Sequence, residues 1–224
     1  MVKSYYFKRQ EGKSLTEWNQ ILREEWYSRK EPEEVVVDFI PLLNAKDKQL
    51  RFLDVGCGAG RHTVYMAKQG FEAYGVDISE TGLNVAKTRL KEQRLKGHLV
   101  KCDMKLLPYV DSCFDAVICL HAIYHQRRTD IQKTIAEIQR TLRKNGFLLA
   151  NFLSKRTYSC GKGLKVEDAT FMELEGVERG VLHHFVDKED IALFFKNFKI
   201  LDLKLVENEV EGKLRSRWVL IATK

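Results

Sequence analysis

The sequence predicts an α/β protein, a three-layer sandwich in which helices cover both faces of a mostly parallel sheet. From residue 50 to residue 152, short apolar segments alternate with amphipathic helical segments, an arrangement that indicates right-handed crossovers between parallel strands. A glycine-containing turn alone joins the last two strand-like segments, so the last strand must run antiparallel to its predecessor. The predicted sheet is seven-stranded, with strands near 50–55, 71–77, 98–103, 114–120, 147–152, 199–206 and 217–223.

The composition is that of a globular protein whose size suits one domain. Of the 224 residues, 44% are hydrophobic and 31% are charged, which is ordinary for globular domains. The longest apolar runs are too short to span a bilayer, and the basic, aromatic segment 1–10 leads into no signal core. We therefore expect a cytoplasmic protein with no membrane association.

The cysteines and the net charge indicate which cellular compartment and which class of partner to expect. The five cysteines are an odd number without a Cys-x-x-Cys pair, so we expect small buried hydrophobes in a reducing compartment rather than a disulfide framework. The formal net charge of +7 is compatible with nucleic-acid binding. Basic residues nevertheless alternate with acids, as at 89–94, which favours a solvated lysine-rich surface without excluding a nucleic-acid partner.

Capping signals and periodicity place the helices. Ser14 and Glu17 have the spacing of a capping box at the start of the first helix, and Pro32 suits the first position of a second helix. The other predicted helices are 61–69, 80–96 with Ser79 as its cap, one after Asp130 and one capped by Asp187.

The whole chain, 1–224, is predicted to be a single domain with four parts. The segment 153–182 is rich in glycine and charge and has weak periodicity, which is typical of a loop or lid over a site. The parts are an N-terminal helical cap (1–46), a cofactor-binding core (50–152), the lid or insertion (153–182), and a C-terminal helix with the antiparallel strand pair (183–224).

The most informative motif is the glycine loop Leu53-Asp-Val-Gly-Cys-Gly-Ala-Gly60. It follows a predicted strand and opens a predicted helix, the context in which such a loop binds a ligand. Its glycines allow close approach of the backbone to a ligand and positive φ angles. A dinucleotide-binding loop would carry its third glycine at the position of Arg61, and no Lys-Ser/Thr pair follows as in a phosphate-binding P-loop.

Two acidic residues end the next two strands. Asp77, in Val76-Asp77-Ile78, is placed to accept hydrogen bonds from a ribose diol. Asp103 suits an exocyclic amine, and Ile78 and Met104 are placed to sandwich an adenine. A single aspartate at a strand end often only caps a turn, but the loop and both acids together indicate a nucleoside-containing cofactor.

These motifs resemble those of the class I S-adenosylmethionine-dependent methyltransferase family, including its small-molecule and tellurite-resistance-like members. The resemblance covers about residues 50–152 and continues through Phe114-Asp-Ala-Val-Ile-Cys119 and Leu142-Arg-Lys-Asn-Gly146. Lys144 and Asn145 replace the proline and first glycine of the family's usual Lys-Pro-Gly-Gly turn, and asparagine tolerates the left-handed conformation. The resemblance implies a Rossmann-like fold whose last strand inserts between its neighbours, and S-adenosylmethionine as the cofactor.

The resemblance also implies a reaction and a cofactor site. In-line displacement of a methyl group from a sulfonium needs no metal and no covalent intermediate, only alignment and, for some acceptors, a base. The implied cofactor-binding residues are Asp54, Gly56, Cys57, Gly58, Gly60, Arg61, Asp77, Ile78, Asp103, Met104, Leu120 and His121.

A small-molecule acceptor is predicted. Leu120-His-Ala-Ile-Tyr124 stands where amine methyltransferases of nucleobases carry an Asn/Asp-Pro-Pro-aromatic run, and Cys119 lies in an apolar strand, unlike the nucleophile of cytosine C5 enzymes. No metal site is expected, because the adjacent histidines 183 and 184 lack a third ligand at helical spacing. The candidate bases are His121 and His184, and the candidate substrate contacts are Trp26, Tyr27, Tyr124, His125, Tyr158 and His184.

Two other function classes stay open. One is an RNA or protein methyltransferase that uses the basic surface. The other is a non-catalytic S-adenosylmethionine-binding module that senses the cofactor or regulates a partner. The sequence defines neither the acceptor atom nor the oligomeric state.

Overall fold

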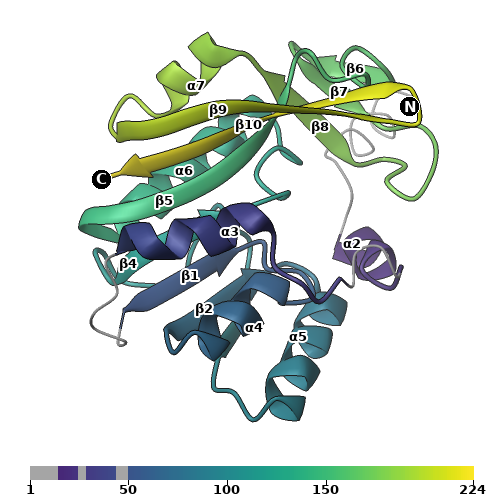
Figure 1. Ribbon diagram of the computed structural model, residues 1–224. Helices are drawn as coiled ribbons and strands as arrows, with labels where there is room; N and C mark the ends of the chain where they lie inside the picture. The colour runs from purple at the N-terminus through teal and green to yellow at the C-terminus, as the bar shows by residue number, and fades with distance from the viewer. Residues whose placement is uncertain (1–14, 25–28, 44–49) are drawn as a thin grey trace, which may run out of the picture.

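One twisted sheet forms the centre of the computed structural model, which describes residues 15–24, 29–43 and 50–224 (Figure 1). The strand order is β3-β2-β1-β4-β5, and β5 is followed by β10 and β9 on one path and by β8, β7 and β6 on another. The strands are β1 (Arg51–Val55), β2 (Glu72–Asp77), β3 (His98–Lys101), β4 (Phe114–Cys119), β5 (Leu142–Ser154), β6 (Leu164–Glu167), β7 (Thr170–Met172), β8 (Leu182–Val186), β9 (Lys199–Val210) and β10 (Lys213–Thr223).

The strand directions confirm the predicted sheet. Strands β3, β2, β1, β4 and β5 pair in parallel, whereas β10 is antiparallel to both of its neighbours, β5 and β9. Glu211 and Gly212 connect β9 to β10 with φ angles of 52° and 70°, the conformation that a tight two-residue hairpin requires. The last strand is thus inserted between two strands that precede it in the chain.

Helices cover both faces of the sheet and form the outer layers of the sandwich. On one face Phe39 and Met66 belong to the same buried cluster as Phe52 of β1, and on the other Ile131 and Phe194 pack with the core strands. Figure 1 shows α3 and α4 on the near face and α6 behind β5. The helices are α2 (Leu15–Ile21), α3 (Glu34–Phe39), the 3₁₀ turn η2 (Ile40–Leu43), α4 (Arg61–Lys68), α5 (Glu80–Glu92), α6 (Arg128–Thr141) and α7 (Lys188–Phe194).

The predicted caps Ser79 and Asp187 are confirmed, whereas Pro32 was wrongly predicted as the first residue of the second helix, because Glu33 is the N-cap of α3 and Pro32 precedes it. The Ser79 hydroxyl accepts from the Gly82 amide at 3.2 Å, and Asp187 forms a full capping box with Asp190 at the start of α7. Ser14, the predicted cap of the first helix, lies outside the described residues. None of the described helices is long and apolar enough to cross a membrane.

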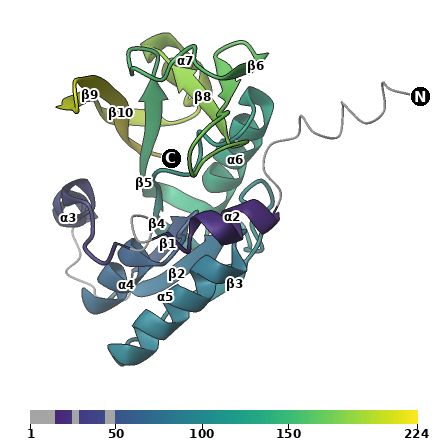
Figure 2. The same ribbon diagram turned by 90° about the vertical axis from the view of Figure 1, so that its right-hand side faces the viewer.

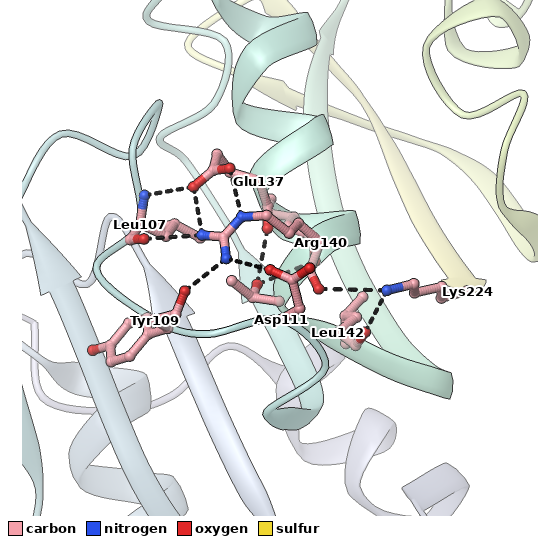
Figure 3. A network of polar contacts seen from close by, with 9 residues as sticks. Leu107, Tyr109, Asp111, Glu137, Arg140, Leu142 and Lys224 are labelled. Atoms are coloured by element: carbon pink, nitrogen blue, oxygen red, sulfur yellow. Dashed lines mark hydrogen bonds and ion pairs between the residues drawn. The ribbon is translucent and has the colours of Figure 1, made fainter.

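The connection between β3 and β4 is fixed to α6 by one arginine (Figure 3). Arg140 donates to the carbonyl oxygens of Leu107 at 3.0 Å and Tyr109 at 2.7 Å, and to the carboxylates of Glu137 and Asp111. A planar guanidinium can satisfy this many acceptors at once because its donors have fixed directions. The network therefore holds the segment that follows the carboxyl end of β3.

The predicted lid segment contains strands of its own. Strands β6 and β7 form an antiparallel pair, β7 pairs with β8, and β8 joins the end of β5 in parallel. The sequence analysis left β8 unassigned because two histidines interrupt its apolar pattern, although all five of its residues are buried. Viewed from the side, α2 lies on the same side of the molecule as β6–β8 (Figure 2).

Candidate functional site

The glycine loop has the conformation expected of a ligand cradle. Gly56, Gly58 and Gly60 all have positive φ angles, of 75°, 50° and 76°. A Cβ added to Gly56 would stand 2.4 Å from the Cβ of Ala122, whereas one added to Gly58 would meet only a Leu22 methyl group, at 3.4 Å. Gly56 is therefore required by close packing of the loop on the segment after β4, whereas Gly58 has room for a methyl group in ordinary contact with Leu22.

Asp54 stabilises the glycine loop through hydrogen bonds with the first turn of α4. Its Oδ2 accepts from the Thr63 amide at 3.1 Å and from the Thr63 hydroxyl at 2.8 Å, so it fixes the first turn of α4. Burial raises the pKa of Asp54 to about 7. Its side chain is 2% exposed, so it shapes the loop rather than facing a ligand.

Asp77, at the end of β2, holds the loop from the other side. Its Oδ2 accepts from the Gly58 amide and its Oδ1 from the Ser79 amide, each at 2.7 Å. Burial raises the pKa of this carboxyl, and these backbone hydrogen bonds oppose the rise. Each carboxylate oxygen retains further acceptor capacity, which suits the predicted ribose hydroxyls.

A cavity of about 1470 Å³ extends from the glycine loop to the lid. Pockets for a single small ligand usually measure about 300–1,000 Å³, so this cavity has room for a cofactor and an acceptor together. Asp54 and Gly60 lie behind its wall. The predicted cofactor-binding residues that line it are Gly56, Cys57, Gly58, Arg61, Asp77, Ile78, Asp103, Met104, Leu120 and His121.

Glu33 is a site residue that the sequence analysis missed. It precedes α3 and forms an ion pair with Arg61, and its Oε1 lies 2.6 Å from His121 Nε2. Burial would raise the pKa of Glu33, but the hydrogen bond from His121 and the charge of Arg61 outweigh it and lower the pKa to about 2. No local sequence pattern marks this residue, because its role depends on contacts with Arg61 and His121, which are distant in the sequence.

His121 stands at the junction of the two ends of the cavity. Its φ angle is 55°, and its backbone amide donates to Asn151 Oδ1 at 2.8 Å. On its ring, Nε2 faces Glu33 and Nδ1 lies 3.2 Å from the Tyr124 hydroxyl. The imidazole is therefore held between a carboxylate and a phenol, an arrangement that can orient a proton acceptor.

Aromatic rings enclose the end of the cavity that lies away from the loop. Tyr124 is buried, which raises the pKa of its hydroxyl. Its ring centroid lies 4.5 Å from that of His125, and Trp18 of α2 meets His125 edge-on at 5.0 Å. Tyr158, 38% exposed, lies at the rim, and the cavity lining also includes Glu178 and His183 from the lid side.

Two arginines of β10 also reach this end. Arg215 and Arg217 line the cavity, and their Nε atoms are buried without a hydrogen-bond partner among the described residues. Arg217 also hydrogen-bonds the Tyr124 hydroxyl. Sequence reasoning missed both, although residues two apart on a strand share a face.

The structure corrects one prediction and leaves two undescribed. His184 is fully buried, its Nδ1 lies 2.7 Å from Thr170 Oγ1, and it does not line the cavity. The physical reason is strand alternation, which turns neighbouring residues to opposite faces and gives the cavity position to His183. Trp26 and Tyr27 lie outside the described residues.

The fold and the site together define an α/β domain whose cavity extends from a glycine loop to the segment 153–182. Residues 53–150 match the protein family described as methyltransferase domain. This part of the chain is therefore a methyltransferase domain of the kind that uses S-adenosylmethionine as its cofactor.

The curated relatives of the matched part include methyltransferases that act on different kinds of acceptor. The chain is similar to a ubiquinone biosynthesis O-methyltransferase of Rickettsia akari (29% identity, 50% of this chain and 45% of the relative). It is also similar to the 18S rRNA (guanine-N(7))-methyltransferase bud23 of Schizosaccharomyces pombe (37% identity, 52% of this chain and 41% of the relative). The matched part is thus less than half the length of each relative.

Two solved structures share the fold over most of the chain. One is a SAM-dependent methyltransferase from Methanosarcina mazei, with a TM-score of 0.70 at 19% identity over 87% of this chain and 98% of that protein. The other is TehB from Haemophilus influenzae, with a TM-score of 0.66 at 15% identity over 88% of this chain and 64% of that protein. The predicted Rossmann-like fold is confirmed.

Proposed function

We propose that the chain catalyses transfer of the methyl group of S-adenosylmethionine to a small-molecule acceptor in the cytoplasm. The observation that carries the proposal is that the glycine loop, Asp77 and His121 line the same cavity as Tyr124 and Arg217, to which we assign the acceptor. All five cysteines are unpaired, which fits a reducing compartment.

The cofactor end fits S-adenosylmethionine. The space above Gly58, where a side chain would stand, suits close approach of a ligand. The free acceptor sites of Asp77 suit the ribose diol, and the exposed carboxylate of Asp103, beside Met104, suits an exocyclic amine. Arg61, at the start of α4, suits the carboxylate of the cofactor. On binding it, Arg61 would release its present partner, Glu33.

The chain's own residues would have two tasks in the reaction. When bound, the cofactor supplies an activated methyl group on a cationic leaving group. Tyr124, Trp18 and the lid side of the cavity would exclude water and fix the direction from which the nucleophile approaches. His121, oriented by Glu33, would accept the proton of an acceptor that must lose one.

A small anionic acceptor is favoured by the charges at the far end of the cavity. Arg215 and Arg217 each present a buried Nε donor there, and a guanidinium forms strong, often bidentate hydrogen bonds with a carboxylate or phosphate. The relative that acts on 18S rRNA makes RNA the second candidate. The aromatic enclosure by Trp18 and Tyr124 favours the small molecule, because an RNA strand needs an open groove.

Ligand binding by itself tests the cofactor assignment. S-adenosylmethionine is expected to raise the melting temperature of the chain by mass action, and Gly58→Val, which fills the cradle, is expected to abolish that shift. NADH is the control ligand. A shift with NADH and none with S-adenosylmethionine would refute the assignment.

Transfer of a labelled methyl group tests the acceptor. Label from S-adenosylmethionine should pass to components of a small-molecule extract, and Arg217→Gln should reduce transfer while sparing cofactor affinity. Label in RNA, with binding that weakens as salt rises, would favour the second candidate. Label in neither, with intact cofactor binding, would indicate a sensing module instead of an enzyme.

A further inference from the structure

Three side chains with metal-ligating atoms meet at the acceptor end of the cavity from separate parts of the chain. His125 follows β4, Glu178 lies in the connection between β7 and β8, and His183 is on β8. One ligand atom of each lies within 4.8 Å of the others. The expectation of no metal considered only His183 and His184, whereas the fold brings the additional ligands from distant segments.

The hydrogen bonding of His125 indicates which of its two ring nitrogens has a lone pair available for a metal ion. Its Nδ1 lies 3.1 Å from the carbonyl oxygen of Leu182. Because a carbonyl oxygen can only accept, Nδ1 carries the proton and Nε2 has the lone pair. A metal-bound histidine commonly donates its other ring N–H to a backbone carbonyl in this way.

The distances within the cluster are close to those of atoms that share one ion. The Nε2 atom of His183 lies 3.0 Å from Oε2 of Glu178, and a small outward shift would bring the two atoms to the separation of about 3.3–3.6 Å expected for tetrahedral ligands held at about 2.0–2.2 Å from zinc. The ring centroids of His125 and His183 are 4.9 Å apart, and two imidazoles bound to one zinc ion stand about 5 Å apart by the same bond lengths.

The surroundings suit a site that is closed on one side and open on the other. Trp18 and Tyr124 pack against His125, and His183 is 9% exposed, so the imidazoles are held by packing and not by solvent-exposed loops. All three ligands line the cavity. Three protein ligands with an open position toward a cavity are typical of a metal that also binds a substrate atom.

We propose that His125, Glu178 and His183 bind one divalent transition metal ion of the class that prefers imidazole and carboxylate ligands, with zinc as its representative. Two nitrogens and one carboxylate oxygen match that preference. The open coordination position faces the space assigned to the acceptor, so the ion would hold an acceptor through an oxygen, nitrogen or sulfur atom. The metal site itself does not depend on the proposed methyl transfer.

Titration with the metal alone tests the proposal. The full chain, first freed of metal with a chelator, is titrated with Zn²⁺ by calorimetry, and a parallel sample with Co²⁺ is followed by visible absorption. One ion per chain is expected, and the Co²⁺ spectrum should show the intense bands of a low-symmetry site with nitrogen and oxygen ligands. Glu178→Gln is expected to weaken binding by at least about 10-fold, the lower range for disturbing a metal's surroundings.

Matched variants separate this site from adventitious binding. Glu173→Gln removes another carboxylate that lines the cavity, and His98→Gln removes an exposed histidine of β3; both should bind Zn²⁺ as the unchanged chain does. His125→Gln and His183→Gln should each abolish the Co²⁺ bands, with circular dichroism to confirm folding. Equal Zn²⁺ affinity in Glu178→Gln and in the unchanged chain, or no Zn²⁺ binding by the folded chain, would overturn the proposal.

Discussion

Replacing Gly56 by alanine should destabilise the fold much more than the same change at Gly58. Both residues have positive φ angles, so alanine at either costs about 1–2 kcal/mol of backbone strain. At Gly56 the new methyl group would also stand 2.4 Å from the Cβ of Ala122, and overpacking of this kind costs about 1–3 kcal/mol. The free energy of unfolding should therefore fall by about 2–5 kcal/mol for Gly56→Ala.

Gly58→Ala is the matched control, because the nearest atom to its new methyl group is a flexible Leu22 methyl at 3.4 Å. Gly58→Ala should lower the free energy of unfolding only by the backbone strain, about 1–2 kcal/mol. The assay is urea unfolding at a single pH without ligand, with the midpoint and the slope fitted separately so that a change in cooperativity is visible.

A double variant identifies the cause of the difference. Ala122→Gly removes the atom with which the new methyl group collides, so Gly56→Ala combined with Ala122→Gly should recover about 1–3 kcal/mol relative to the sum of the single changes. Equal destabilisation by Gly56→Ala and Gly58→Ala, or no recovery in the double variant, would show that the loop does not pack against the segment after β4 as described.

Three further predictions concern charged side chains. Asp77→Ala should weaken S-adenosylmethionine binding by about 2–3 kcal/mol in calorimetry, since it removes acceptors of the ribose hydroxyls; unchanged affinity would contradict the assignment. The pKa of Asp54 is raised from 3.8 to about 7 in the folded chain, so its contribution to stability is complete below pH 4 and is lost as pH rises to 7. Asp54→Asn should flatten that fall in a series of urea midpoints, and parallel curves would refute the reasoning. Arg140→Lys should cost about 1–3 kcal/mol, whereas Arg143→Lys at an exposed ion pair should cost less than about 1 kcal/mol; similar midpoints for the two would contradict the role of the Arg140 network.

The features that sequence predicted well are those set by short-range patterns. The strand that ends at Asp54, the glycine loop and the helix from Arg61 follow one another directly, so periodicity and turn chemistry suffice to place them. The same holds for the terminal strand pair, because a two-residue turn leaves no other direction for the second strand. Strands β6 to β8 were missed because they are short and their pattern is interrupted by polar residues.

The acceptor end of the site depends on long-range placement and could not be predicted in the same way. Glu33 contacts Arg61 and His121 only because the fold brings the residue before α3 beside α4 and the end of β4, and Glu178 comes from a connection without regular structure. His183 and His184 are neighbours in the sequence, yet only His183 lines the cavity. A shift of one residue along a strand reverses the face, and the sequence gives no reference for which face of β8 meets the cavity.

The antiparallel insertion of β10 explains why that strand contributes to the site at all. Parallel strands present their carboxyl ends to the cofactor edge of the sheet, so Asp77 and His121 come from strand ends. Because β10 runs in the opposite direction, Arg217 lies opposite Leu153 near the end of β5, while Thr223 lies opposite Phe147 near its middle. The first half of β10 therefore extends to the edge where the other strands finish, and it carries Arg215 and Arg217 into the cavity. Reversal of one strand thus supplies the acceptor end with positive charge from a segment more than 90 residues beyond His121 in the chain.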